Sequence, residues 1–403
     1  MTEQLEATSH RDNMMEQLCS TKMVTPAFVV LEHELADRLN RIRQFCDEIG
    51  LSLLFSLKSF ALVDGLKAIS RSVNGFSCSS LFEARLARSV LSRPKTVHLV
   101  APYLTEESTD EMVQICDFVS LNSIGQIDRF RNRLAGRASV GLRVNPELSF
   151  VKDRRYDPCR PDSKLGVPID EMVKVLRRRR DYFELITGIH MHTNCESEDL
   201  SELALTIEKV SRRLGDLLGQ LHWWNLGGGY VFDQAANLPR FAATIERVRR
   251  TFGLRFWVEP GAAIVRESCC LIACVVDLFE RGGRHIAVLD TSVNHWPEVF
   301  EYQFEPDVVG HVEGGRYQYI LAGCSCLAGD LFGEYSFNQP LELGSRVVFA
   351  NAGAYSLVKA HMFNGINLPT IYVLTEMGEL VMKKRFTYDD FASRCGVDSH
   401  ATV

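Results

Sequence analysis

The segment LSLLFSLKSFALVDGLKAISRSVNGFSC, residues 51–78, contains the unit that repeats through most of this chain. Residues 51–57 are mainly apolar and strand-like, and residues 61–71 have the amphipathic spacing of a helix. Gly75–Cys78 is strand-like again. A strand, a helix and a second strand in this order are typical of a βαβ unit with parallel strands. The segment therefore predicts an α/β fold.

The same alternation continues from about residue 40 to residue 265. Further strand candidates are 97–101, 118–121, 139–144, 185–192, 223–226 and 256–259, and further helix candidates are 81–91, 106–116, 127–134, 169–177, 200–214 and 238–251. Strand–helix alternation over about 200 to 250 residues is what a (β/α)8 barrel requires. We therefore expect a barrel over residues 40–263.

The pattern changes after Pro260-Gly261. Strand-like runs at 263–279, 285–290, 317–321, 345–350 and 369–375 are separated by Gly, Pro and Asn turns, and helical spacing returns only at 389–395. We expect a tail over residues 1–22, a strand-bearing segment over 23–39 that joins the second domain, and a mostly β domain over 264–403.

Composition restricts the class of protein. The 403 residues are 46% hydrophobic and 24% charged, as in a soluble globular protein, and the net charge of −6 argues against nucleic acid as a partner. The start of the chain lacks the apolar run of a signal peptide, and no apolar stretch is long enough to cross a membrane. The 12 cysteines include no CxxC pair. These features indicate a cytoplasmic protein with reduced thiols and no membrane partner.

Two features suggest a ligand site: a lysine whose desolvated amine can form an imine, and a glycine run that can approach a phosphate. Lys58 ends an apolar strand, and the carboxyl ends of barrel strands face the active site of this fold. Alone, this position is more typical of a lysine that only reaches solvent. Gly227, Gly228 and Gly229 follow a late strand, where backbone amides without side chains can approach a phosphate. A tight turn is the alternative for the glycines.

Four further residues have side chains able to act as ligands, acids or bases. His190 and His192 alternate on a strand candidate, where we favour a ring that stacks on a cofactor or a core histidine over a zinc ligand, because no fourth ligand is spaced suitably. Glu259 ends the last barrel strand, and a buried carboxylate there needs a partner, although a turn cap is the alternative. Cys326 lies in a Gly-rich loop and is either an acid or inert.

The order of the motifs is more informative than any one of them. The chain contains LLFSLKSF at 53–60, GFSCSSLFEARLA at 75–87, GLRVNPE at 141–147, YDPCRPDSKLG at 156–166, GIHMHTNCE at 188–196, NLGGGY at 225–230, VEPG at 258–261, CLAGDLFGEYSF at 326–337 and YSLVKAHMFNGINLP at 355–369. This series resembles the pyridoxal-phosphate (PLP) dependent decarboxylases with an alanine-racemase-like barrel, and within them the carboxynorspermidine/carboxyspermidine group. The resemblance extends from about residue 25 to residue 395.

The resemblance implies a PLP site and roles for its residues. Lys58 is implied to hold PLP as a Schiff base, His192 to stack on its ring and Glu259 to pair with its pyridine nitrogen. Cys326, delivered by the partner subunit of a homodimer, is implied to protonate the substrate carbon after CO2 leaves. The remaining implied contacts are Gly227, Gly228, Gly229 and Tyr355 to the phosphate, Arg143 to the phosphate or the phenolic oxygen, Glu83 behind the cofactor, and Lys164 beside the subunit interface.

The chain departs from the family pattern at positions that bear on the substrate. Ala262, Ala354 and Ser77 stand where relatives carry other residues, and the segment around His295 is shorter than in the nearest group. We expect acidic side chains from the β-domain loops to bind a distal ammonium, and the candidates are Asp290, Glu298, Glu301 and Asp330.

The sequence therefore predicts PLP-dependent decarboxylation of a carboxylated polyamine in polyamine biosynthesis, without a metal ion. A decarboxylase of another diamino acid or conjugate in specialised metabolism is the main alternative. An amino-acid racemase on the same barrel, or a catalytically inactive homologue that binds a partner, is less favoured because Lys58 and Cys326 are both present.

Overall fold

The protein was studied as a computed structural model, which describes residues 14, 15, 18 and 20–397. It contains two compact units, one formed by Ala36–Ile264 and the other by the residues on either side of that range. Most of the predicted tail, residues 1–22, lies outside the described residues.

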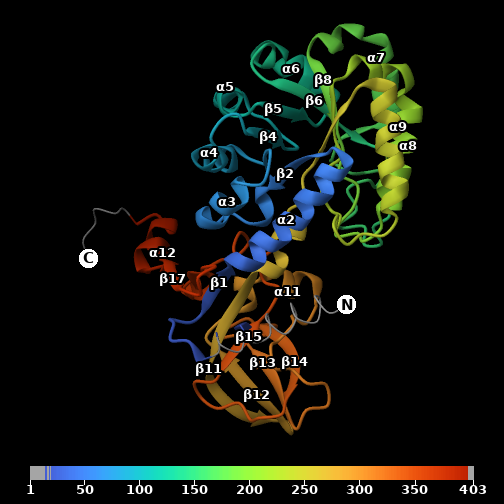
Figure 1. Ribbon diagram of the computed structural model, residues 1–403. Coiled ribbons are helices and arrows are strands. Elements are labelled where there is room, and N and C mark those ends of the chain that lie inside the picture. The colour runs from blue at the N-terminus through green and yellow to red at the C-terminus, as the bar shows by residue number, and fades with distance from the viewer. Residues whose placement is uncertain (1–13, 16–17, 19, 398–403) are drawn as a thin grey trace. The chain divides into compact units, whose positions relative to one another are not determined.

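The first unit is a closed barrel of eight parallel strands within the described part of the chain (Figure 1). The barrel strands are β2 (Ser52–Ser56), β3 (Gly75–Cys78), β4 (Thr96–Val100), β5 (Phe118–Leu121), β6 (Ser139–Asn145), β8 (Ile186–His190), β9 (Trp223–Asn225) and β10 (Arg255–Val258). Pairing of β10 with β2 and of β5 with β6 closes the ring. The two-residue β7 (Val167–Pro168) pairs with β6 outside the ring. The predicted barrel is confirmed.

Helices surround the barrel and connect consecutive strands (Figure 1). They are α2 (Glu32–Ile49), α3 (Val63–Ser70), α4 (Leu81–Val90), α5 (Glu106–Ile115), α6 (Ile124–Leu134), α7 (Ile169–Arg178), α8 (Leu200–Leu214) and α9 (Leu238–Phe252). Each has an amphipathic pattern, with apolar side chains toward the strands. The strands are accordingly buried on both faces, which explains their nearly continuous apolar sequences.

An aromatic cluster fills the barrel interior toward the amino ends of the strands. Trp223 and Trp257 pack there with Leu54 and Phe118. A Cβ atom on Gly188 would lie 2.1 Å from the Trp223 ring, so glycine at this position makes room for the indole. The filled interior leaves the carboxyl end of the barrel for a pocket.

The second unit contains a mostly β sheet. Its strands are β1 (Ala27–Leu31), β11 (Cys269–Arg281), β12 (Arg284–Leu289), β13 (Tyr317–Ala322), β14 (Leu331–Phe337), β15 (Arg346–Phe349), β16 (Thr370–Leu374) and β17 (Leu380–Lys384). β1 pairs antiparallel with β11 and parallel with β16, which brings the start of the chain into this sheet. Its short helices include α11 (Pro297–Tyr302) and α12 (Tyr388–Arg394).

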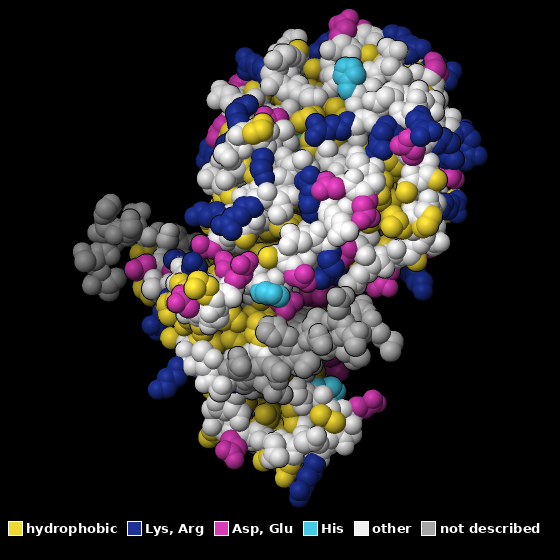
Figure 2. Space-filling view, viewed as in Figure 1, with side chains coloured by type: hydrophobic (Ala, Val, Ile, Leu, Met, Phe, Trp, Pro, Cys, Tyr) yellow, Lys and Arg dark blue, Asp and Glu magenta, His cyan; other side chains and the backbone are white. Residues whose placement is uncertain are grey.

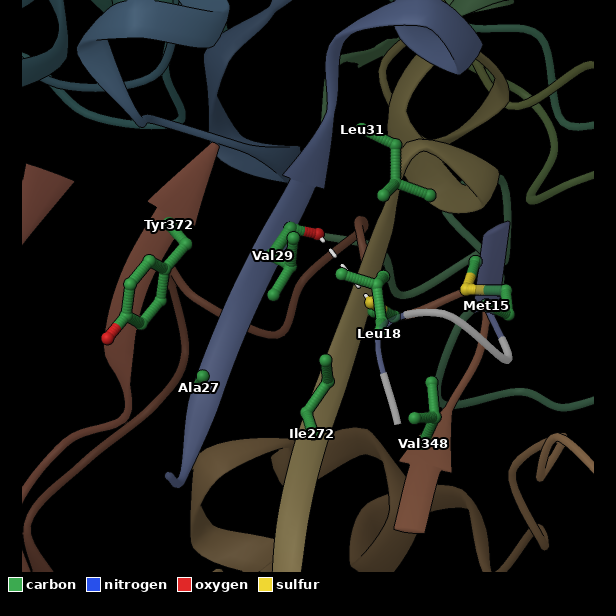
Figure 3. Packing of buried hydrophobic residues seen from close by; sticks show 9 residues of the cluster. Met15, Leu18, Ala27, Val29, Leu31, Ile272, Val348 and Tyr372 are labelled. Carbon is green, nitrogen blue, oxygen red and sulfur yellow. Dashed lines mark hydrogen bonds between the residues drawn. The ribbon is translucent and has the colours of Figure 1, made fainter. Parts of the chain in front are cut away.

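Apolar side chains on one face of this sheet form a core (Figure 3). Val29 and Ile272 from neighbouring strands pack with Val348 and Tyr372, and Met15 and Leu18 cover them. All six are at most 5% exposed. A hydrophobic side chain buried this fully contributes about 1.5 to 3 kcal/mol.

One predicted strand was wrong at its start. The expected strand 263–279 begins only at Cys269, because Ala262–Val265 forms the short helix α10, whose turn is closed by a 2.9 Å hydrogen bond from Ile264 N–H to the Gly261 carbonyl oxygen. Periodicity cannot distinguish a short apolar run in a helical turn from one in a strand.

The visible surface of the barrel unit has no single basic patch. Figure 2 shows its Lys and Arg side chains interspersed with Asp and Glu. Ion pairs such as Arg131–Asp181 and Arg133–Asp110 belong to this unit. Within the described residues, no helix is long and apolar enough to cross a membrane.

Candidate active site

A pocket of about 460 Å³ opens at the carboxyl ends of the barrel strands. It is lined by Lys58, Arg143, His192 and Glu259, so four of the predicted cofactor residues share one cavity. Lys58 lies two residues beyond the end of β2, in a single 3-10 turn at Leu57–Ser59, whereas the sequence placed it directly at the strand end. Its side chain is exposed. The strand end therefore presents the Lys58 amine to the pocket without burying it within this chain.

Glu259 follows β10 and is bound on several sides by the chain. Its Oε1 lies 3.1 Å from His190 Nε2, and its Oε2 accepts a hydrogen bond of 3.0 Å from Asn225 Nδ2. The Ser77 hydroxyl provides a further side-chain hydrogen bond. Burial would raise the pKa of Glu259, but His190 and the hydrogen bond from Ser77 hold this pKa well below its usual value. Glu259 is therefore a fixed negative charge.

His190 is the neutral partner of this carboxylate. Burial, as the largest cause, lowers the pKa of His190, so the ring is uncharged at neutral pH. Its Nδ1 has no hydrogen-bond partner in the described structure. We assign the proton to Nε2, which donates to Glu259 and leaves Nδ1 as a bare acceptor, because an unpaired acceptor is tolerated better than an unpaired donor.

His192 lies just beyond β8 and contacts the glycine turn. Gly228 N–H donates to His192 Nδ1 over 3.2 Å. Burial, and next the positive charge of Lys58, lower the pKa of His192 well below its usual value, so this ring is also neutral. A neutral, flat ring fixed by its Nδ1 suits stacking on an aromatic cofactor. The stacking role stays a prediction.

The three glycines are required by close packing of the chain itself. A Cβ atom would lie 2.3 Å from the Met191 carbonyl oxygen at Gly227, 2.4 Å from that of Glu259 at Gly228, and 1.9 Å from that of Asn194 at Gly229. Gly227 and Gly229 also have positive φ angles of 79° and 86°. Gly229 N–H has no hydrogen-bond partner among the described residues, which leaves one backbone donor for an anion.

Arg143, on β6, is a buried cation without a direct ion-pair partner among the described residues. It is 8% exposed, and its guanidinium forms neither a hydrogen bond nor an ion pair with the described residues. Burial lowers its pKa to about 10, so it remains charged at neutral pH. An unpaired buried cation, a free backbone donor and a fixed carboxylate together match the phosphate or phenolic oxygen and the pyridine nitrogen of PLP. The residues present therefore fit this cofactor.

Two other predicted residues lie in the barrel unit. Glu83 is in the first turn of α4 and its Oε2 accepts a 2.6 Å hydrogen bond from Ser79 N–H, so its carboxylate caps the helix beside the pocket residue Ser79. Burial raises the pKa of Glu83. Lys164 lines the pocket from the long loop between β6 and β7.

Cys326 and Tyr355 belong to the second unit. Cys326 is exposed, and its backbone N–H donates to Asn364 Oδ1 over 2.8 Å, which fixes the loop that carries the thiol. Tyr355 has a φ angle of 57°, in a backbone region that residues other than glycine rarely adopt. A strained backbone at a predicted contact residue is consistent with a functional constraint.

The four predicted substrate acids each interact with their own unit. Asp290 Oδ1 accepts a hydrogen bond from Cys274 N–H, and Asp330 accepts from Val293 N–H and from Ser325 N–H. Lys359 pairs with both Glu298 and Glu301. Asp290 and Asp330 are therefore local structural residues, whereas binding of a ligand by Glu298 and Glu301 would compete with Lys359. Substrate binding by these four residues stays a prediction.

Sequence reasoning missed part of the pocket. It did not assign Asn225, which precedes the Leu226-Gly227 pair, or the function of Ser77 and His190 as partners of Glu259. It also missed Asp157, a pocket-lining carboxylate within the motif YDPCRPDSKLG. The available signal for Asp157 was its position in a long loop that follows a barrel strand. No group of three or more potential ligands among the described residues is arranged for a metal ion.

Comparison with known proteins places this geometry in a family. Residues 33–268 match the family described as pyridoxal-dependent decarboxylase, pyridoxal binding domain. Over 95% of this chain and 98% of the relative, the sequence is 34% identical to carboxyaminopropylagmatine decarboxylase of Synechocystis sp.. It is 32% identical to carboxynorspermidine/carboxyspermidine decarboxylase of Herminiimonas arsenicoxydans, over 92% and 98%.

A solved structure agrees with these matches. The crystal structure of carboxynorspermidine decarboxylase from Campylobacter jejuni, complexed with norspermidine, is similar to this chain with a TM-score of 0.82 and 28% identity. The similarity covers 92% of this chain and all of the other.

Proposed function

Because this chain belongs to the pyridoxal-dependent decarboxylase family, we propose that it is a PLP-dependent enzyme that removes CO2 from a carboxylated polyamine in polyamine biosynthesis. The observation that carries the proposal is the pocket that gathers the Lys58 amine, the unpaired Arg143 cation, the neutral His192 ring and the fixed Glu259 carboxylate. PLP, when bound, supplies an electron sink for the electron pair that CO2 leaves behind.

The chain's own residues hold charges and protons around this chemistry. Glu259 keeps a negative charge at one end of the pocket, stabilised by His190 and Asn225. Arg143 binds an anionic group, and Lys58 offers its amine for covalent attachment of the cofactor. Cys326 donates a proton to the carbon that loses CO2. Its backbone N–H is bound by the Asn364 side chain, which fixes the loop that carries the thiol.

The substrate class follows from the relatives. They are named for carboxylated amines that differ in the group beyond the reacting carbon, agmatine in one case and norspermidine or spermidine in the other. We propose the spermidine-type substrates first and the agmatine-type substrate as the alternative within the same chemistry. A diamino acid or conjugate of a specialised pathway is the further alternative.

We also propose a homodimer in the cytoplasm. The exposed Phe82 and Tyr103 stand near the pocket residues Ser79 and Pro102 in sequence, and large exposed aromatic side chains are typical of interfaces. The cysteines of the described residues are all free, as in a reducing compartment.

Measurement of CO2 release tests the reaction and its substrate together. Purified protein with PLP is assayed with carboxynorspermidine, carboxyspermidine, carboxyaminopropylagmatine, diaminopimelate, ornithine and lysine. We expect the highest kcat/KM for a carboxylated polyamine. Inversion of an amino acid without gas release would instead indicate a racemase, and no reaction with any substrate would favour an inactive homologue.

Variant mixing tests the residues and the dimer. We expect Lys58→Ala and Cys326→Ala each to lose at least about 100-fold in CO2 release, as for loss of a covalent or acid group. Mixed in equal amounts, they should recover about a quarter of wild-type activity, because half of the dimers are mixed and each has one complete site. No recovery, with exchange of subunits verified, would contradict a shared site.

A further inference from the structure

We propose that Asp157, on the wall of the barrel pocket, binds a cationic nitrogen of the substrate, either an ammonium or a guanidinium group. This inference rests on the proposed function and specifies how the amine end of the substrate is recognised. It assigns to the barrel unit a carboxylate that the sequence-based candidates, all in the second unit, did not include.

The segment that carries Asp157 is held in place by the barrel. Cys159 is buried and its Sγ contacts the His192 carbonyl oxygen at 3.8 Å. Farther along the same loop, Asn122 Nδ2 donates to the Lys164 carbonyl oxygen over 2.8 Å. Asn145 Nδ2 donates to the Arg160 carbonyl oxygen over 3.3 Å. Asp157 thus occupies a defined position at the pocket, although it belongs to a loop.

Asp157 is a buried residue whose carboxylate is only half engaged. The residue is 7% exposed, and its Oδ1 accepts a 2.8 Å hydrogen bond from Cys159 N–H. Its Oδ2 has no hydrogen bond and no cation within ion-pair distance among the described residues. A buried charge of this kind is costly unless it is paired, so the pocket favours a positive ligand group at this oxygen.

The other charged groups of the pocket leave this position open. Glu259, the second carboxylate of the lining, is engaged by His190 and Asn225. Two cations of the lining have acidic partners on the loop, since Arg155 pairs with Asp153 and Arg160 with Asp162. Arg160 Nη1 also donates to the backbone carbonyl oxygen of Asp157 over 3.4 Å, but not to its carboxylate.

Lys164 and Lys58 also face the pocket, and neither pairs with Asp157. Among the described residues, the pocket therefore presents one cation without an ion-pair partner, on the buried Arg143, and one carboxylate oxygen without a donor, on the buried Asp157. A ligand that bears an anionic group and a second, cationic nitrogen satisfies both. A carboxylated polyamine together with the phosphate of the cofactor has this pair of charges.

Asp157→Asn tests the proposal with little change in shape. The amide oxygen of Asn can still accept from Cys159 N–H, so the turn is kept while the charge is removed. Asp157→Ser, whose hydroxyl can also accept from Cys159 N–H, is the second neutral variant. Asp170→Asn is the matched control, because Asp170 lies in the first turn of α7 in the same unit, is exposed and does not line the pocket.

Calorimetry on the PLP-loaded protein provides a readout that does not depend on turnover. The probes are spermidine and agmatine, which carry a cationic nitrogen beyond the reacting amine, and hexylamine, which carries none. We expect both neutral variants to raise the Kd of spermidine and agmatine by about 10- to 100-fold, as for loss of a charge-assisted hydrogen bond, with hexylamine and PLP content unchanged. A stronger effect on agmatine identifies a guanidinium as the preferred group, and a stronger effect on spermidine identifies an ammonium.

The opposite results are equally defined. An unchanged Kd for both polycations, an equal loss for hexylamine, or wild-type protein that does not distinguish spermidine from hexylamine would overturn the role of Asp157. If the wild type binds spermidine through Asp157 but releases no CO2 from any carboxylated polyamine, the proposed function fails while the binding site stands.

Discussion

Two buried carboxylates in the same pocket have opposite surroundings. Glu259 has both oxygens bound by side chains from neighbouring strands, whereas Asp157, on a loop, has one oxygen without any partner in the described structure. A fully bonded carboxylate is fixed in charge and position before any ligand arrives, which suits a group that stays in the site. A partly bonded one gains most when a ligand arrives, which suits a group that is exchanged in every cycle.

Substitution of Glu259 by Gln tests whether the fixed charge of this carboxylate is needed for the reaction, and we expect it to have the largest effect. The amide keeps the shape but removes the negative charge that His190 and Ser77 stabilise. We expect kcat for CO2 release to fall by about 100- to 1,000-fold with KM changed little, because preorganised charge acts mainly on the transition state. Loss at Asp157 should change KM instead. A rise in KM alone for Glu259→Gln would remove the distinction between the two carboxylates.

Asn225→Ala tests whether the bonding around Glu259 is also structural. Asn225 donates to Glu259 Oε2 and accepts from Gly227 N–H over 2.9 Å, so it joins the carboxylate to the glycine turn. Its removal takes one hydrogen bond from the Glu259 carboxylate and leaves Gly227 N–H without its acceptor. We expect the free energy of unfolding of the PLP-free protein in urea to fall by about 1 to 3 kcal/mol. Asn132→Ala, at an exposed position on α6, should change it by less than about 0.5 kcal/mol.

The smallest expected effect concerns His98, deeper in the same barrel. Burial, as the main cause, lowers its pKa to about 3, and its ring stacks on Phe118 with centroids 4.1 Å apart. In the unfolded chain His98 binds a proton near pH 6.5, whereas in the folded chain it stays neutral until about pH 3. The free energy of unfolding therefore falls as the pH falls from 6.5 toward 3.

Between pH 6.5 and 5.5 this one group should destabilise the fold by about 1 kcal/mol. The measurement is urea unfolding of wild type and His98→Gln at both pH values. The variant should show a smaller loss between them. An identical loss in both proteins would mean that His98 is charged or solvated in the folded state.

Much of the fold could be predicted because its signals are local. Gly75–Cys78, Phe118–Leu121 and Leu200–Leu214 have the predicted bounds, since buried parallel strands and amphipathic helices have distinct apolar patterns. β14 and β17 were missed because glycine or charged side chains interrupt their apolar residues. These strands form because β14 pairs with β13 and β17 pairs with β16. The hydrophobic periodicity of one segment does not show which other segment it pairs with.

The family and its cofactor, predicted from the order of the motifs, are confirmed. The sequence also placed Lys58, Arg143, His192 and Glu259 near strand ends, and the structure brings these four into one pocket. The partners of Glu259 could not be predicted, because hydrogen bonds from Asn225 and His190 depend on the curvature that brings β8, β9 and β10 together. The difference between Asp157 and its exposed neighbours is a matter of burial, which composition does not reveal.

Asp330 has a consequence for protein engineering. One carboxylate oxygen binds the Val293 amide and the other binds the Ser325 amide, so the turn at Val293–His295 and the Cys326 loop share a single anchor. Transfer of the Cys326 loop to another scaffold would therefore require the turn and its aspartate as well. In directed evolution, we expect variants with substitutions in either segment to keep both conformations only while Asp330 is retained. The two segments and Asp330 should therefore be varied together.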